Sequence, residues 1–349
     1  MPRIAQVRAR PLDVAMRKPF GIAGGAQEHA RNVLVTLETD GGPTGLGEGA
    51  PFPAFNGETQ EAVLASCARV ELAGVDLEDT AEIRARLGDA TPSTRCAIET
   101  AVVDARARVR RIPLHVMFGG SMTEIVTDVT ITTGTIDDAR REAASFAAFS
   151  TLKVKVGTNV EEDVTRVLAV RAARPDARLL VDANAGFTLD DALAFAAGVR
   201  AARVDLFEQP VRSWDDLAAF RARAGVRVAI DESVTCAADV AIAKARGAAD
   251  AVNVKIMKSG IFEVLAILAR AEEEGLDRMI GGMVETRLAM GTSACIAAGR
   301  GGLTIIDLDT PLFLAADPFA GGYAQDGERI DLAPIERGHG LRELRGALV

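Results

Sequence analysis

The stretch LKVKVG at residues 152–157 places two lysines, Lys153 and Lys155, inside an otherwise apolar run. Side chains two residues apart on a β-strand point to the same face of the sheet, so both lysines would share one face. Two like charges in such positions repel each other, and a buried strand needs a reason to keep both. The charges on the neighbouring strands give that reason.

Eight short apolar or β-branched runs follow one another from about residue 125 onward, and alanine-rich amphipathic segments separate most of them. The runs are DVTIT, LKVKV, RLLVDAN, VDLFEQP, VRVAIDES, DAVNVKIM, DRMIGGM and LTIIDLD. Strands that alternate with helices predict parallel βαβ units, and eight units in roughly 200 residues predict a (β/α)8 barrel. A doubly wound sheet is the alternative, but no glycine-rich phosphate-binding motif follows the first strand.

The first third of the chain has a different pattern. RIAQVRARPLDV and NVLVTLETDGG predict antiparallel strands, the glycine-rich KPFGIAGGAQEHA between them predicts a mobile loop, and residues 58–110 are mostly helical. We therefore expect an α+β domain at residues 1–120 and the barrel at residues 121–312. The segment 313–349 is too short for another βα unit and is predicted to return to the first domain.

Charged residues end successive strands at a regular spacing. From Lys155 through Asp182, Glu208 and Asp231 to Lys255, the intervals are 27, 26, 23 and 24 residues. One βα unit has about this length, so the charges lie at the same height on successive strands, at the carboxyl ends where barrel enzymes place their active sites.

Three carboxylates on successive strands stay ionised side by side when a hard divalent cation binds them, and Mg²⁺ prefers oxygen ligands. Asp182, Glu208 and Asp231 are therefore the predicted ligands of one Mg²⁺ per subunit; ion pairs with the barrel lysines are the alternative. Lys155 and Lys255 would flank the metal from opposite sides of the barrel mouth. We expect the metal and the Lys153 ammonium to lower the pKa of Lys155 toward neutrality. Two bases on opposite faces of one carbon predict 1,1-proton transfer, which is racemisation or epimerisation.

The motifs KVKVG, VDANAGF, FEQP, IDES and VNVKIMKSG occur in this order, and with them the chain resembles the muconate lactonizing enzyme subgroup of the enolase superfamily. The resemblance covers essentially the whole chain. It implies an α+β capping domain over a (β/α)7β-type TIM barrel, one Mg²⁺, and an enolate formed by removing the proton α to a carboxylate. It also implies that Lys155 and Lys255 are the bases and that Lys153 contacts the substrate carboxylate. The lack of histidine in the barrel strands argues against the mandelate racemase and enolase branches.

Within the subgroup, IIDLDTPLFL resembles the last strand of dipeptide epimerases, where a D-x-D pair binds the α-ammonium of the substrate. This implies a dipeptide substrate bound through Asp307 and Asp309, although Asp309 could instead cap the turn at DTP. GGMVETRLAMG, which includes Met283, also resembles that family, and Thr130 matches a threonine that faces the substrate.

The side chain of the second residue of the dipeptide is the least defined part of the predicted substrate. Epimerases for Ala-Glu carry an arginine in the loop where this chain has Gly24 and Gly25. A second loop, PFPAFNGET, offers Phe52, Phe55 and Asn56. We therefore expect an apolar or small second residue rather than glutamate, while Glu28 and the acidic composition leave a cationic one open.

Other readings share the chemistry or the scaffold. An N-succinylamino acid racemase, an o-succinylbenzoate synthase or a muconate cycloisomerase acts on substrates without a free ammonium, and a noncatalytic binding protein would need no complete set of bases and metal ligands. The net charge of −9 among 349 residues argues against nucleic acid as a partner. No apolar run is long enough to span a membrane, and no signal peptide is visible at the start. We expect a cytoplasmic homo-oligomer with four reduced cysteines.

Overall fold

A computed structural model describes residues 2–120 and 122–344; the predicted domain boundary at residue 121 and the last five residues, 345–349, lie outside the described residues. Eight parallel strands form the central sheet, in the order β12-β11-β10-β9-β8-β7-β6-β5. Each corresponds to one of the eight predicted runs. They are β5 (Val129–Ile131), β6 (Thr151–Lys155), β7 (Arg178–Asp182), β8 (Leu206–Glu208), β9 (Val228–Ile230), β10 (Ala251–Val254), β11 (Asp277–Ile280) and β12 (Ile305–Ile306).

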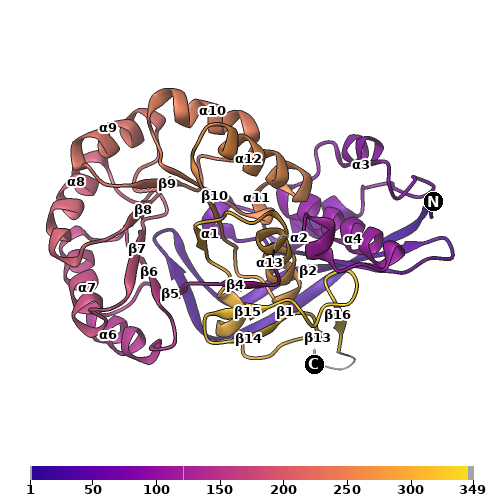
Figure 1. Cartoon of the computed structure of the whole chain (residues 1–349), viewed down its shortest axis with the longest axis horizontal. Helices are drawn as coiled ribbons and strands as arrows, with labels where there is room; N and C mark the ends of the chain where they lie inside the picture. The colour runs from indigo at the N-terminus through magenta and orange to yellow at the C-terminus, as the bar shows by residue number, and fades with distance from the viewer. Residues whose placement is uncertain (1, 121, 345–349) are drawn as a thin grey trace.

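A helix follows each of the first seven strands, and these helices curve around the outside of the sheet (Figure 1). A 3₁₀ turn, η2 (Thr310–Phe313), follows the eighth strand instead, so the predicted (β/α)7β-type barrel is confirmed. A polar N-cap side chain begins each of α6 to α9, where it accepts a backbone N–H of the first turn. The helical segments are α6 (Ile136–Ser145), α7 (Val160–Ala173), α8 (Leu189–Gly198), η1 (Arg200–Ala202), α9 (Trp214–Ala224), α10 (Ala237–Arg246), α11 (Ile256–Ser259), α12 (Ile261–Glu273) and α13 (Arg287–Arg300).

The interior of the barrel is built in layers. An apolar layer crosses it near the amino ends of the strands and consists of Leu180, Leu206, Ala229, Ala251, Met279 and Ile305. Two residues further along each strand, the same inward face carries Asp182, Glu208, Asp231, Asn253, Gly281 and Asp307. The period of two on a β-strand thus places a polar layer directly above an apolar one.

The two ends of the sheet meet where β5 and β12 approach each other. The backbone N–H of Asp128 donates to the carbonyl oxygen of Ile306 at 2.8 Å, and the N–H of Leu308 donates to Thr127 Oγ1 at 2.8 Å. These bonds close the barrel and bring the residues before β5 beside those after β12.

The N-terminal domain pairs an antiparallel sheet with helices. Its glycine-rich strand β3 packs closely against α4. A Cβ on Gly45 would lie 1.9 Å from the carbonyl oxygen of Ala101, and a Cβ on Gly47 would lie 1.9 Å from that of Ala97, so only glycine fits at these positions. The strands are β1 (Ile4–Ile22), β2 (Gly25–Thr39) and β3 (Gly45–Gly49). The helices are α1 (Pro53–Asn56), α2 (Gln60–Cys67), α3 (Thr80–Leu87), α4 (Pro92–Arg110) and α5 (Leu114–Met117).

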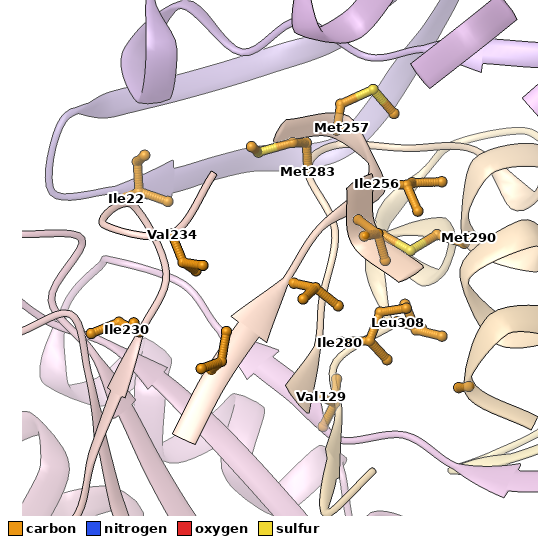
Figure 2. Close-up of a cluster of buried hydrophobic side chains, with 14 of the residues drawn as sticks. Ile22, Val129, Ile230, Val234, Ile256, Met257, Ile280, Met283, Met290 and Leu308 are labelled. Atoms are coloured by element: carbon orange, nitrogen blue, oxygen red, sulfur yellow. The ribbon is translucent and has the colours of Figure 1, made fainter. Parts of the chain in front are cut away.

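One correction concerns the segment between the first two strands. It was predicted to be a mobile loop, but β1 and β2 continue through it as a hairpin, and Phe20, Gly21 and Ile22 pair with Gln27, Ala26 and Gly25. Burial of Phe20 and Ile22 over the barrel outweighs the low strand propensity of the glycines. Figure 2 shows Ile22 at this hairpin, with Met257 and Met283 extending from the barrel toward the N-terminal domain.

A buried carboxylate on β3 joins the two domains. Glu48 accepts hydrogen bonds from the Thr286 N–H (2.9 Å), the Thr286 hydroxyl (2.6 Å) and the Ala289 N–H (3.0 Å). These donors belong to the amino end of α13, where the unpaired N–H groups favour an anion. Glu48 therefore fixes the N-terminal domain against the loop that carries Met283.

The C-terminal segment contacts both domains. The N–H of Ala315 donates to the carbonyl oxygen of Ala15, and Phe319 and Leu341 pack with Leu12 and Leu34 of the N-terminal sheet. Short strands complete this segment: β13 (Phe319–Gly321) pairs with β16 (Leu341–Glu343), and β15 (Arg329–Asp331) pairs with both β14 (Ala324–Asp326) and β4 (Glu124–Val126). Among the described residues, no helix is long and apolar enough to cross a membrane. The four cysteines are free, as expected.

Candidate active site

Three carboxylates meet at the carboxyl ends of adjacent strands. Asp182 ends β7 and lies in register with Glu208 at the end of β8, while Asp231 directly follows β9. One oxygen from each lies within 4.8 Å of the others, and all three side chains are buried. Burial, together with the charge of Asp182, raises the pKa of Glu208 to about 7. At Asp231 the effect of burial is outweighed by Lys255 and Lys258, which hold the pKa at about 2. The three predicted metal ligands therefore lie close to one another, and nearby cations must balance their negative charge.

Lysine ammonium groups surround this carboxylate triad. Lys153 Nζ lies 3.1 Å from Asp182, 2.8 Å from Glu208 and 2.8 Å from Asp307. Lys155 Nζ lies 2.6 Å from Asp182 on one side, and Lys255 Nζ lies 2.7 Å from Asp231 on the other.

Acidic side chains determine the charge state of two of these lysines, Lys153 and Lys255, while the expected effect of Lys153 on Lys155 stays a prediction. Burial disfavours the charged form of Lys153, but the nearby Asp182, Asp307 and Glu208 outweigh it and raise its pKa. The same balance, dominated after burial by Asp231, raises the pKa of Lys255. The protein groups alone therefore keep these ammonium groups charged, because acidic side chains neutralise the repulsion that the strand pattern suggested.

The two predicted bases face one cavity from opposite sides of the barrel. Lys155 ends β6 and Lys255 directly follows β10, four strands away in the sheet. Of the predicted site residues, those that line this cavity are Phe52, Phe55, Thr130, Lys155, Lys255, Met283, Asp307 and Asp309. Lys153 and the carboxylate triad lie buried below it.

A second acidic group lies at the closing seam of the barrel. Asp307 Oδ2 is paired with Lys153, which outweighs burial and lowers the pKa of Asp307. Asp309 Oδ2 accepts the backbone N–H of Thr130 at 2.5 Å, while burial and the charge of Asp307 raise its pKa to about 7. Asp309 precedes η2 without making a side-chain capping bond, so it does not serve the alternative capping role.

The remaining wall of the cavity is apolar. Phe52 and Phe55 come from the loop around α1, Phe20 and Ile22 come from the β1–β2 hairpin, and Met283 follows β11. The Phe55 ring centroid lies 4.9 Å from Lys255 Nζ. Asn56, the polar residue that the sequence offered in this loop, does not line the cavity; its side-chain amide donates to Glu58 at 2.7 Å.

Gly24 and Gly25 lie outside the cavity lining. A Cβ on Gly24 would lie 2.6 Å from the carbonyl oxygen of Ala54, and Gly25 has a φ of +146° with Ala54 Cβ beside it. The two glycines let the hairpin turn pack directly against the loop that carries Phe52 and Phe55.

Known proteins share both domains of this fold. Residues 136–342 match the family described as enolase C-terminal domain-like, and residues 4–119 match the mandelate racemase/muconate lactonizing enzyme N-terminal domain. The chain belongs to the enolase superfamily.

Several relatives of this superfamily member are named as epimerases. An aromatic dipeptide epimerase of Herpetosiphon aurantiacus is 43% identical, with 97% of this chain and 98% of the relative covered. An L-Ala-D/L-Glu epimerase of Thermotoga maritima is 36% identical, with 95% and 99% covered. A crystal structure of the Enterococcus faecalis dipeptide epimerase with Mg and L-Leu-L-Tyr has a TM-score of 0.94 at 30% identity, covering 98% of this chain and all of that one.

Several polar residues of this superfamily member escaped the sequence analysis. The Asn253 amide donates to Glu208 at 2.7 Å, and Lys258 Nζ lies 2.7 Å from Asp231. Asn184 donates to Glu232. Burial, together with the charge of Asp231, raises the pKa of Glu232 to about 8. Asn253 had a detectable signal, because it lies two residues before Lys255 on the same strand face. The sequence pattern predicted only a strand at Asp128 and no functional role.

Proposed function

We propose that this protein is a Mg²⁺-dependent dipeptide epimerase that inverts the α-carbon of the C-terminal residue by 1,1-proton transfer. One observation carries the proposal: Lys155 and Lys255 line opposite sides of a cavity that also contains Asp307 and Asp309 and lies above three buried carboxylates. The names of the relatives agree with this activity.

Asp182, Glu208 and Asp231 are the residues that would hold one Mg²⁺ per subunit. Their buried oxygens lie within 4.8 Å of one another, and a hard divalent cation matches this all-oxygen donor set. When bound, Mg²⁺ would balance the charge of the triad and act as a Lewis acid for negative charge that develops on the substrate carboxylate.

The lysines supply the proton transfers and part of the binding. With the substrate α-carbon between them, Lys155 and Lys255 can remove the proton from one face and return a proton to the other, which converts one epimer to the other through an enolate. Lys153, paired with three carboxylates below the cavity, would stabilise the substrate carboxylate as its charge increases.

Asp307 and Asp309 account for the dipeptide rather than an N-acylated substrate. A free ammonium that leaves water needs a paired anion in the site, and two carboxylates at one edge of the cavity provide it. N-succinylamino acids and muconate lack this charge, which makes the racemase, synthase and cycloisomerase alternatives poorer fits.

The apolar wall favours an apolar second residue, including an aromatic one. Phe20, Ile22, Phe52 and Met283 offer no cation to a glutamate side chain. Nearby Lys18 is paired with Glu142, and Arg31 is paired with Glu61. Assembly into a homo-oligomer remains a prediction.

Deuterium exchange tests the proposal. The Mg²⁺-loaded protein is incubated in D₂O with a dipeptide library, and mass spectrometry detects one deuterium at the α-carbon of the second residue. We expect exchange and epimerisation of L-Ala-L-Phe and L-Ala-L-Leu, and loss of both in excess chelator. Glu208→Gln should abolish turnover while circular dichroism shows an intact fold. Full activity in chelator, or faster turnover of N-succinylamino acids than of any free dipeptide, would contradict the proposal.

A further inference from the structure

Asp128 is a buried acid to which the proposed mechanism gives no role. It directly precedes β5, and its backbone N–H is bound to Ile306 at the barrel seam. Asp128 lies two residues before Thr130, so both side chains point to the same face of the strand. Thr130 lines the cavity, and Asp128 lies below it. Oxygens of Asp128, Asp307 and Asp309 lie within 4.8 Å of one another.

Among the described residues, no group donates a hydrogen bond to the side chain of Asp128, and Lys153 is the cation that favours its negative charge. Asp128 is 2% exposed, and among the described residues neither of its carboxyl oxygens has a hydrogen-bond partner. A buried carboxylate without donors is costly, and two carboxylates beside it increase the cost. Burial, followed by the charges of Asp307 and Asp309, raises the pKa of Asp128 well above its ordinary value.

A proton removes this conflict and creates a donor. Asp307 is the neighbouring acceptor, since Lys153 holds one of its oxygens at 2.8 Å and keeps it ionised. A carboxylic acid that donates to a carboxylate makes a charge-assisted hydrogen bond, which is stronger and more directional than a neutral one. Asp307 would then be held by Lys153 and by Asp128, while Asp309 is held by the Thr130 N–H.

We propose that Asp128 is a positioning residue that stays a neutral acid and donates its proton to Asp307, which orients the Asp307/Asp309 pair for the substrate ammonium. This inference rests on the proposed function only in naming the ammonium as the ligand. The protonation of Asp128 and its bond to Asp307 are properties of the substrate-free protein.

Infrared difference spectroscopy tests the neutral acid directly. The Mg²⁺-loaded protein without substrate should show a buried carboxylic acid band at neutral pH that is lost in Asp128→Asn. The band should be unchanged in Asp137→Asn, which alters an exposed carboxylate on α6. A spectrum without this band in the wild type, or with the band retained in Asp128→Asn, would overturn the inference whether or not the protein turns over dipeptides.

Kinetics test the positioning role. Asparagine keeps a donor at this position, so Asp128→Asn should change the KM for L-Ala-L-Phe by less than about threefold, whereas Asp128→Ala should raise it about 10-fold or more. In Asp128→Ala, kcat should change less than KM, since the lysines are untouched. Equal losses in both variants, or no loss in Asp128→Ala, would refute the hydrogen-bond role. If Asp128→Ala does not fold, the infrared result still decides protonation, and Asp128→Leu repeats the kinetic test.

Discussion

Two groups of three carboxylates lie in this barrel and share contacts with Lys153, but they differ in how their charge is balanced. Asp182, Glu208 and Asp231 are surrounded by four lysines, Lys153, Lys155, Lys255 and Lys258. Among residues 2–120 and 122–344, Asp128, Asp307 and Asp309 have one direct lysine partner, Lys153, at Asp307. The lysines around the first group therefore suit the anionic end of a substrate, while Asp309 in the second group has no lysine partner among the described residues and suits a cation. Charge balance, rather than the number of carboxylates, therefore distinguishes the two groups.

The largest expected effect tests the lysine-rich side. Lys155→Ala should slow exchange of the α-proton for one epimer by about 10²- to 10⁴-fold and leave the other epimer exchanging, because each base serves one face of the carbon. Lys255→Ala should show the opposite preference. The measurement is deuterium incorporation from D₂O into each epimer of Ala-Phe, followed separately by mass spectrometry.

Lys244→Ala, on the exposed side of α10, is the matched control and should exchange both epimers normally. A Lys155→Ala or Lys255→Ala protein that exchanged both epimers at wild-type rates would rule out the two-base mechanism.

The next effect tests the acidic side. Asp307→Asn or Asp309→Asn should cost about 2–5 kcal/mol of transition-state binding for a free dipeptide, roughly 30- to several-thousand-fold in kcat/KM, because a buried ammonium loses its partner. Mg²⁺ binding, measured by calorimetry, should persist, since the metal ligands belong to the other group.

N-acetylated dipeptides serve as the control substrates. They should be poor substrates of the wild type and should lose far less on either substitution. If they lost as much as free dipeptides, the two groups would not be separable and Asp307 and Asp309 would be structural.

The smallest effect concerns the apolar wall. L-Ala-L-Phe should have a higher kcat/KM than L-Ala-L-Glu, since a glutamate side chain here lacks a charge-assisted bond worth about 1.5–3 kcal/mol, or roughly 10- to 150-fold. Steady-state kinetics of the two dipeptides at saturating Mg²⁺ measures the ratio. A preference for Ala-Glu would show that a cation reaches the second side chain after all.

The barrel and the chemistry-bearing residues of its strands were predictable because strand periodicity and the spacing of βα units are local properties. Lys155, Asp182, Glu208, Asp231 and Lys255 follow one another at nearly constant intervals. The hairpin at residues 18–30 was predicted wrongly, because its strand pairing depends on burial of Phe20 and Ile22 over a distant part of the chain. The role of Glu48 was not predicted for a similar reason, since the donors that join it to the barrel lie more than 230 residues later in the chain.

The order of residues along the chain was enough to predict the fold class, the two opposed lysines and the carboxylates on successive strands. Each of these predictions rests on a pattern that repeats from one βα unit to the next. Which charges neutralise one another depends on distances between different strands, and only the folded barrel defines them. Lys153 pairs with Asp307 across the closing seam, and within the described part of the chain no group there donates a hydrogen bond to Asp128. Electrostatic energy in a buried site changes steeply over a few ångströms, so the state of each ionisable group was decided in the tertiary structure.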